Sequence, residues 1–482
     1  METLKEKTAK GLFWGGMNNG VQQLLGLAFG IILGRLLDPS DYGMTAMLTV
    51  FSVIANELQS SGFKTGLINL KAPTHEDYNA VFWFNILAGV AIYVVLFFCA
   101  PLIADYYHKP QLIPLGRYVF LGFVFSSFGM AQSAYMTKQM QIKQIAKCGM
   151  TATLTSSLIS VILAALGFGY WALATQYLAY IAINTILLWY FSPWRPTFSP
   201  LTSHLSPLKK LFPFSFKIMV SAIFTQVNNQ IMNVLLGRYY GDANTGHYNK
   251  AYEWSSKCFL LVGNMMRQVD QTVFVGLHDE RERQLMVLRK MVRFTAFIAF
   301  PLLFGLGLVS HEFIVLAIGE KWTFSASLLP YLCLCGAFMP LSTLLTDAII
   351  SHQRSDIYLW STMALGILQV ILLVALWREG IYTMVIAYTA LNILWLFVWH
   401  FFTRRLMGYR LLSFLKDIVP FALAAAAVMV VTGLITQGID NLWLLLISRT
   451  VIAAILYYAI MRLSGAVILK ECIAFIMKKK SA

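Results

Sequence analysis

Charged residues are scarce in this chain of 482 residues. Asp, Glu, Lys and Arg make up only 12% of it, whereas they make up about a quarter of a typical soluble domain. Hydrophobic residues account for 58%, and the mean hydropathy is +0.66. This balance argues against a soluble globular protein and predicts a polytopic membrane protein.

Cysteines and catalytic motifs are also few. The six cysteines are scattered and lie mostly inside apolar stretches, so neither a disulfide framework nor a metal site is indicated. The sequence has no GxxxxGKS or GxxxxGKT phosphate loop, no His-x-x-x-His pair and no nucleophile elbow. We therefore predict that the protein is not an enzyme and that it holds no metal and no cofactor.

Long apolar runs occupy most of the chain. About 20 apolar residues cross a bilayer as a helix, and we predict roughly fourteen such spans. They are residues 12–34, 42–66, 78–104, 113–137, 148–168, 170–192, 212–237, 246–274, 294–310, 324–350, 357–377, 380–402, 418–436 and 441–462. The first run continues past Leu33, which is too long for the core of a signal peptide.

Basic residues outnumber acidic ones by 37 to 22, which gives a net charge of +15. With the N-terminus in the cytoplasm, most of the basic residues fall at cytoplasmic helix ends, as the positive-inside rule predicts. Membrane topology and contact with anionic lipids explain the excess, and nucleic-acid binding is not expected. The even number of spans places both termini in the cytoplasm.

A short block of sequence occurs twice, 203 residues apart. The recurring positions are Leu33, Gly34, Arg35 and Gly43, which return as Leu236, Gly237, Arg238 and Gly246. The same offset relates His75-Glu76-Asp77 to His278-Asp279-Glu280. We infer an internal duplication. Duplicated halves with polar residues between them are typical of a membrane transporter whose substrate site lies at the repeat interface.

The predicted fold class is all-α, with two six-helix repeats and two additional helices. Six spans precede the proline-rich connection at 192–210, and six follow it before Arg404. Because six is even, both halves enter the membrane in the same direction and form parallel repeats. We predict an N-terminal lobe over residues 1–205, a C-terminal lobe over 206–405, and two C-terminal helices with a basic tail over 406–482.

Two motifs resemble those of bacterial polysaccharide flippases. Residues 33–43, LGRLLDPSDYG, resemble the motif after the first helix of that family, and residues 246–251, GHYNKA, resemble the start of its eighth helix. Ser61-Gly62-Phe63 also fits. The family is the Wzx-type, O-antigen and polysaccharide transporter branch of the multidrug/oligosaccharidyl-lipid/polysaccharide exporter superfamily, and the resemblance extends over essentially the whole chain.

This resemblance implies a V-shaped, two-lobed flippase in the bacterial inner membrane. Such a protein moves polyprenyl-pyrophosphate-linked oligosaccharide, the precursor of lipopolysaccharide, capsule or exopolysaccharide, from the inner to the outer leaflet by alternating access. A polysaccharide polymerase and glycosyltransferases are the partners it implies. The alternative is an ion-coupled multidrug exporter of the same superfamily. The first span has no acidic residue, and the usual coupling aspartate of drug exporters lies there.

The eighth predicted span has a polar face along nearly its whole length. Its members fall within about 60° of one helical line: Lys250, Glu253, Lys257, Asn264, Gln268 and Gln271. A charge at the bilayer centre costs at least ~2.5 kcal/mol. One hypothesis is a hydrated cationic cavity wall that binds the pyrophosphate, with Arg267 at its inner end. The other is a self-neutralising intrahelical ladder; we favour the cavity.

Amides are concentrated on the first and seventh spans. Gln23 coincides with Gln226 under the duplication, and Asn228 and Asn229 lie beside the latter. Amide groups both donate and accept hydrogen bonds, which suits sugar hydroxyls. The competing interpretation is hydrogen bonding between helices; the concentration on corresponding spans favours a role in lining the substrate path.

Further basic residues are candidates for contact with the substrate. Arg35 and Arg238 are at outer helix ends, where an outer gate and simple anchoring of the helix both remain open. Arg449 lies about eight residues inside the last span and is expected near a phosphate, beside a groove for the lipid tail.

Three acidic residues within or near spans are candidates for ion coupling. They are Glu57, Asp270 and Asp347. Burial raises the pKa of a carboxyl group, which lets it bind H⁺ near neutral pH. The sequence leaves open whether H⁺, Na⁺ or the membrane potential alone drives transport.

Overall fold

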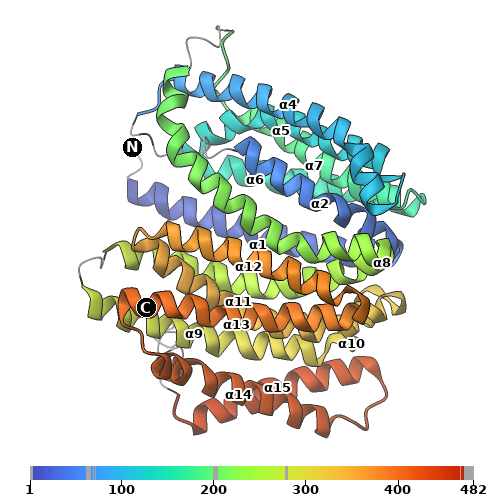
Figure 1. Cartoon of the computed structure of the whole chain (residues 1–482), viewed down its shortest axis with the longest axis vertical. Helices are drawn as coiled ribbons and strands as arrows, with labels where there is room; N and C mark the ends of the chain where they lie inside the picture. The colour runs from blue at the N-terminus through green and yellow to red at the C-terminus, as the bar shows by residue number, and fades with distance from the viewer. Residues whose placement is uncertain are drawn as a thin grey trace. The chain divides into compact units, whose positions relative to one another are not determined.

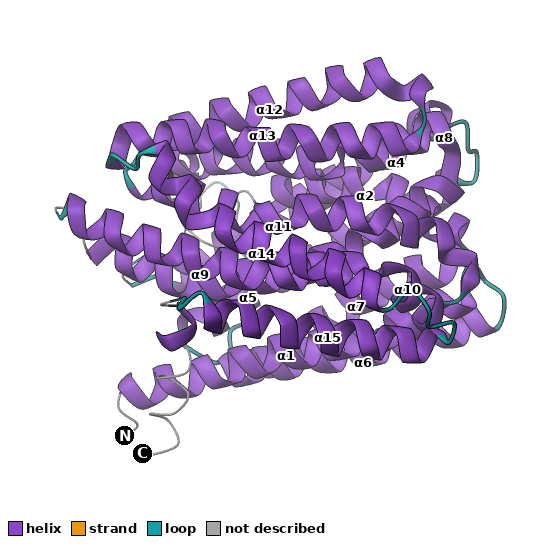
Figure 2. Cartoon of the chain, turned by 90° about the horizontal axis from the view of Figure 1, so that it is seen from below, coloured by secondary structure: helices purple, strands orange, loops and turns teal. Residues whose placement is uncertain are grey.

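The structure is a computed structural model that describes residues 4–60, 67–68, 70, 72–198, 205–276, 280–466 and 468–471. Side chains are not described for residues 4–13, 60, 205–219, 221 and 267–276. Within these ranges the chain folds into helices joined by short connections, without a strand (Figure 2). The predicted all-α class is confirmed.

The helices of the N-terminal half are α1 (Leu4–Leu36), α2 (Pro39–Ser60), α4 (His75–Tyr107), α5 (Leu112–Lys138), α6 (Ile142–Ala165), α7 (Tyr170–Phe191) and α8 (Leu205–Gly276) (Figure 1). They are followed by α9 (Arg281–Leu308), α10 (Ser310–Ile318), α11 (Thr323–Ser351), α12 (Ser355–Leu376), α13 (Ile381–Met407), α14 (Leu411–Ile435) and α15 (Leu442–Leu463). Single 3₁₀ turns, η2 (Glu320–Trp322) and η3 (Trp377–Glu379), precede α11 and α13.

Helix α8 covers both the seventh and the eighth predicted spans. A break divides it at Gly241, whose φ of 80° and ψ of −175° lie outside the helical region. The positive φ favours glycine, which has no Cβ to clash with the backbone. The two predicted spans are therefore two helices that meet at Gly241, and the label α8 covers both.

Ten of the described helices are long and apolar enough to cross a membrane: α4 to α7, α9 and α11 to α15. The chain is an integral membrane protein. Helices α1, α2 and α8 coincide with the four other predicted spans but are not among the ten. These are the helices to which Gln23, Glu57 and Lys250 belong, and polar residues lower their hydropathy. The full number of fourteen spans stays a prediction.

The chain divides into two compact units, residues 1–246 and 247–482. In the first unit, α4 packs on α5, α5 on α7, and α6 on α7. In the second, α9 packs on α11, α11 on α13, and α12 on α13. These helices correspond in order along the two halves, so the same packing order occurs in both units. Helices α14 and α15 pack on each other and on α9 (Figure 1).

The border between the units lies inside α8, past the predicted lobe boundary at 205. The reason is that the residues around Gly241 contact helices of the first unit, as the ion pair of Lys109 with Asp242 illustrates. The lobe boundaries were placed at the proline-rich connection and from the number of spans on either side of it, and they stay a prediction.

The core of the first unit fixes the position of α2. Met47 of α2, Tyr107 of α4, Phe120 of α5 and Ala174 of α7 belong to one buried apolar cluster. Burial of such side chains contributes roughly 1.5–3 kcal/mol each for the large ones. The packing holds one face of α2 against α5 and α7.

The duplicated His75-Glu76-Asp77 block begins α4. The Thr74 hydroxyl accepts a hydrogen bond from the Asp77 backbone N–H, and the Asp77 carboxylate accepts one from the Thr74 N–H at 2.8 Å. This reciprocal capping box satisfies backbone groups that the first helical turn leaves free. The block thus contributes to the start of a helix.

Candidate functional site

Three charged residues of α8 form a continuous chain of ion pairs, which we call the α8 ladder: Lys250, Glu253 and Lys257. Lys250 Nζ donates to Glu253 Oε2 at 3.0 Å, and Lys257 Nζ donates to Glu253 Oε1 at 2.7 Å. The spacings of three and four residues place all three side chains on one helix face. Two lysines share one carboxylate, so the ladder keeps one formal positive charge.

The members of the ladder differ in exposure. The Lys250 side chain is 1% exposed, whereas Lys257 and Glu253 are 25% and 34% exposed. The Lys257 ammonium also lies 4.6 Å from the centroid of the Trp254 ring, within the range of a cation–π interaction. The intrahelical ladder, which was the alternative to the cavity wall that we favoured, is therefore present, and Lys257 with Glu253 forms its more exposed end. The cavity wall stays a prediction.

The amides predicted to line the substrate path also differ in exposure. Gln23 of α1, Asn229 and Asn264 of α8 are exposed, and Asn228 is buried. Exposed amides are available to an external hydroxyl group, whereas a buried one is retained by partners in the protein. Gln23, Asn229 and Asn264 are thus the members accessible to a ligand.

Arg238 is held at the turn between α4 and α5. Its guanidinium contacts the Tyr106 carbonyl and the His108 ring, and it lies 5.2 Å from the centroid of the Tyr106 ring. Nearby, Lys109 Nζ pairs with Asp242 at 2.9 Å. Arg35, its counterpart in the duplication, is exposed. The two related arginines therefore have different surroundings.

The duplicated glycines of the same region make a reciprocal backbone contact. A Cβ atom at Gly43 would lie 1.8 Å from the Asp242 carbonyl oxygen, and one at Gly246 would lie 1.8 Å from the Pro39 carbonyl oxygen. The 203-residue offset relates Gly43 to Gly246 and Pro39 to Asp242. Each glycine thus allows the backbone of the other repeat to approach, which explains why the block ends in glycine twice.

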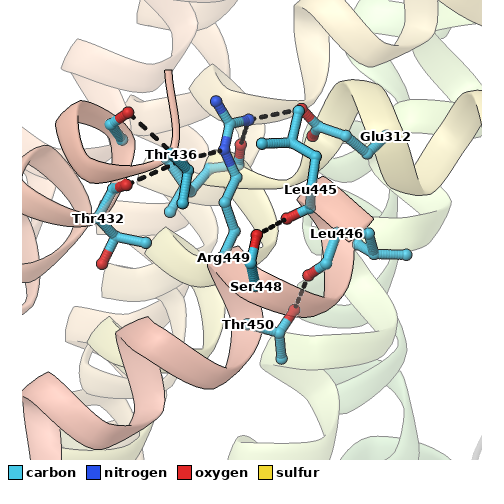
Figure 3. A network of polar contacts seen from close by, with 10 residues as sticks. Glu312, Thr432, Thr436, Leu445, Leu446, Ser448, Arg449 and Thr450 are labelled. Carbon is cyan, nitrogen blue, oxygen red and sulfur yellow. Dashed lines mark hydrogen bonds and ion pairs between the residues drawn. The ribbon is translucent and has the colours of Figure 1, made fainter. Parts of the chain in front are cut away.

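Arg449 of α15 binds three protein groups. Its guanidinium pairs with Glu312 of α10 at 2.5 Å, and it donates to the Thr436 hydroxyl and the Leu308 carbonyl at 3.2 Å each (Figure 3). Glu312 is only 4% exposed. The geometry is that of a buried clamp joining α15 to α10 and to the end of α14.

An apolar groove of about 590 Å³ adjoins this clamp. Phe297 and Pro301 of α9, Met429 of α14 and Tyr457 of α15 are among its lining residues, and Arg449 contributes to the lining as well. Since Glu312 neutralises that arginine, the groove offers mainly hydrocarbon contacts. An extended apolar chain fits this chemistry.

The acidic candidates belong to α2, α8 and α11. Glu57 of α2 accepts a hydrogen bond from Gln226 of α8 at 3.4 Å. Asp347 is half-buried near the end of α11. The side chains of Arg267 and Asp270 lie outside the described residues, although their backbone belongs to α8.

A buried carboxylate near the start of α14 was not among the predicted site residues. Asp417 is 5% exposed on its side chain, and Arg289 of α9 binds both of its oxygens at 2.7 and 3.1 Å. The Tyr409 hydroxyl donates to Asp417 at 2.8 Å, and burial together with this bond raises the pKa of Tyr409 well above its usual value. Arg289 and Asp417 lie 128 residues apart, and no spacing pattern in the sequence relates them.

A polar stripe on α2 was also missed. Its members are Thr45, Thr49, Ser52, Asn56 and Gln59. At 100° per residue they fall within about 80° of one another, so the spacing of four, three, four and three residues was a usable signal. The stripe faces a pocket in the first unit.

A family model described as polysaccharide biosynthesis protein matches residues 32–327, more than half of the chain. The lipopolysaccharide biosynthesis protein WzxC of Escherichia coli strain K12 is 27% identical over 360 residues, which cover 74% of this chain and 72% of WzxC. The teichuronic acid biosynthesis protein TuaB of Bacillus subtilis strain 168 is 23% identical over 455 residues, which cover 91% of this chain and 90% of TuaB.

Two solved structures are similar in fold. The lipid II flippase MurJ in an inward closed conformation matches with a TM-score of 0.72 at 14% identity, covering 93% of this chain and 97% of MurJ. An inward-facing multidrug resistance MATE family transporter of the MOP superfamily matches with a TM-score of 0.66 at 15% identity, covering 80% of this chain and 94% of the transporter. At such low identity these likenesses show the fold alone.

Proposed function

The chain belongs to the polysaccharide biosynthesis protein family, as its resemblance to the Wzx-type flippases predicted, and on this basis we propose that it moves lipid-linked oligosaccharide across the bacterial inner membrane. The substrate would be a glycan joined through pyrophosphate to a polyprenyl chain, moved from the inner to the outer leaflet. The transport would proceed by alternating access between two like-oriented repeats. The repeated packing order in the two units supports these repeats.

The observation that carries this proposal is the α8 ladder. An ionisable group within a membrane span is costly and is a functional candidate by default. The partly exposed Lys257 and Glu253 would meet the pyrophosphate, and Lys257 would exchange its carboxylate partner for phosphate oxygens. The buried Lys250 would hold Glu253 in place and keep the site electropositive. This assigns Lys250 to positioning and Lys257 to contact with the headgroup.

The other groups of the substrate have matching surfaces. Sugar hydroxyls would bind the exposed amides Gln23, Asn229 and Asn264. The polyprenyl chain would occupy the apolar groove between α9, α14 and α15. Arg449 would maintain that groove through its clamp and would not contact the phosphate, because Glu312 already satisfies its charge.

The membrane potential supplies a driving force in the proposed direction. Moving a dianion outward across a membrane with an inside-negative potential of 100 mV releases roughly 4–5 kcal/mol, at ~2.3 kcal/mol for each charge. Glu57 and Asp347 are the described candidates for additional coupling to H⁺ or Na⁺.

Deletion of the gene followed by complementation tests the proposal. Cells without the protein should lose surface polysaccharide and accumulate lipid-linked oligosaccharide, and wild-type protein should reverse both effects. Lys257→Gln should restore little of the surface glycan, because it removes the accessible positive charge. Lys147→Gln, at an exposed site of α6, is the matched control and should complement fully.

Two other outcomes would contradict this account. Full surface polysaccharide in the Lys257→Gln strain, at normal protein levels, would remove the ladder from the substrate path. Unchanged glycan in the deletion strain, together with new sensitivity to hydrophobic cations, would favour the multidrug exporter. This alternative is considered because the fold of the chain is similar to that of a multidrug resistance MATE family transporter.

A further inference from the structure

A pocket lined by polar and aromatic residues lies beside the polar stripe of α2. We call it the α2 pocket; it has a volume of about 460 Å³ and lies between α2, α5 and α7. Its polar and aromatic lining residues include Thr49, Ser52, Asn56, Ser126, Tyr177 and Tyr180. Small-molecule sites typically enclose about 300–1,000 Å³ with a few polar groups on apolar walls. The α2 pocket fits that description.

The inner end of the stripe is closed by the protein itself. Gln59 is fully buried, donates to the Phe123 carbonyl at 2.8 Å and accepts from the Ser126 hydroxyl at 2.8 Å. The Thr49 hydroxyl donates a hydrogen bond to the Thr45 carbonyl within α2. These bonds tie α2 to α5 and form a fixed floor beneath the pocket.

Four polar side chains of the pocket remain without such bonds. Within the described residues, Ser52, Asn56, Tyr177 and Tyr180 make no side-chain hydrogen bond, although all four line the pocket. Their atoms are not buried unsatisfied groups, because the pocket exposes them. A purely apolar occupant would strip water from these groups without replacing it, which is unfavourable.

The two tyrosines of the pocket come from one helix, α7. Tyr177 and Tyr180 are three residues apart on α7 and share one helix face. Neither ring packs against another aromatic ring among the described residues. None of the described residues that line the pocket is charged, which argues against a phosphate, a metal ion or an organic cation as the occupant. A suitable ligand is uncharged, has an apolar face and has several hydroxyl groups.

These features are those that a pyranose ring requires, and we propose that the α2 pocket is a binding subsite for one neutral sugar unit. The C–H face of the sugar would lie on a tyrosine ring, and its hydroxyls would bind Ser52, Asn56 and the tyrosine hydroxyls. The inference deepens the proposed function, since the sugar would belong to the transported glycan. It assigns a second contact, separate from the headgroup contact at Lys257, that selects among glycans.

Saturation-transfer NMR on the full-length purified protein in nanodiscs tests the subsite directly. The probes are the methyl glycosides of glucose, galactose, mannose, rhamnose and N-acetylglucosamine, with the glucuronide as a charged comparison. At least one neutral glycoside should receive saturation from the protein, and the glucuronide should receive less. Asn56→Leu and Tyr177→Leu should each weaken that binding about fivefold, because a hydrogen bond or a stacking contact is lost. Tyr190→Leu, at a 77% exposed site of the same helix, should leave it unchanged.

Two results would overturn the subsite. One is no transfer to any glycoside from wild-type protein that elutes as a single folded species. The other is equal binding by the pocket variants and by Tyr190→Leu. Because free glycosides have no pyrophosphate, this assay does not depend on Lys257. If the wild-type protein binds sugar and the Lys257→Gln variant transports normally, only the headgroup site is refuted. If strains that carry Asn56→Leu or Tyr177→Leu have normal surface glycan, the role of the pocket in selecting glycans is refuted.

Discussion

The clamp between Arg449 and Glu312 allows a quantitative prediction that separates two roles for this arginine. Arg449→Met should destabilise the protein by about 3–5 kcal/mol, because it leaves a buried carboxylate without its counter-charge. Glu312 is 4% exposed, and its second oxygen already lacks a partner among the described residues, so little is available to compensate.

Removing the charge of Glu312 should destabilise the protein less than removing that of Arg449. Glu312→Gln leaves the arginine with the Thr436 hydroxyl and the Leu308 carbonyl as acceptors, and the Arg449 side chain is 19% exposed. We expect a loss of about 1–3 kcal/mol, the cost of an incompletely satisfied buried group. The double variant Arg449→Met with Glu312→Leu should be more stable than Arg449→Met alone, because it leaves no unpaired charge.

Unfolding in mixed micelles with rising SDS, followed by near-ultraviolet circular dichroism, measures these differences. A thermodynamic coupling of about 0.5–3 kcal/mol between the two positions would support the clamp. The opposite pattern would refute it: Arg449→Met as stable as wild type, yet inactive in transport. In that case Arg449 would bind substrate, as the sequence alone predicted.

Two further predictions concern packing. Gly43→Ala and Gly246→Ala should each destabilise the protein by about 1–3 kcal/mol, because the added methyl group would lie 1.8 Å from a backbone oxygen. Gly433→Ala, whose nearest contact is at 3.7 Å, is the control. Equal unfolding midpoints for all three variants would contradict the close contact. Asp417→Asn should weaken the junction of α14 with α9 by about 1–3 kcal/mol, since Arg289 loses its counter-charge but is 36% exposed and can be hydrated. Limited proteolysis should then release the C-terminal helices faster, and an unchanged cleavage rate would argue against the junction.

Much of the fold was predictable because hydropathy and duplication are local or periodic signals. The spacing of Lys250, Glu253 and Lys257 predicted the ladder itself, since positions three and four apart face each other on a helix. The burial of Lys250 was not predictable, because it depends on residues distant in sequence. The same reason applies to Arg449, whose partner Glu312 lies 137 residues away.

The stripe on α2 was missed for a different reason. The Thr49 hydroxyl donates a hydrogen bond to a carbonyl of the preceding helical turn, so a threonine in a membrane span gives little evidence of function by itself. Only the walls supplied by Tyr177 and Tyr180 distinguish a pocket from ordinary packing. Likewise, the duplication predicted the recurrence of Gly43 at Gly246, but not that each glycine contacts the other copy of the block.

Reconstituted flipping of the glycolipid tests the central claim most directly. Lipid-linked oligosaccharide from the deletion strain is placed in liposomes with the purified protein, and an impermeant glycosidase outside digests whatever reaches the outer leaflet. Wild-type protein should expose the entire pool, whereas Lys257→Gln should leave the inner-leaflet fraction protected, as protein-free liposomes do. If wild-type protein also leaves that fraction protected, the chain does not translocate this substrate and the account is wrong.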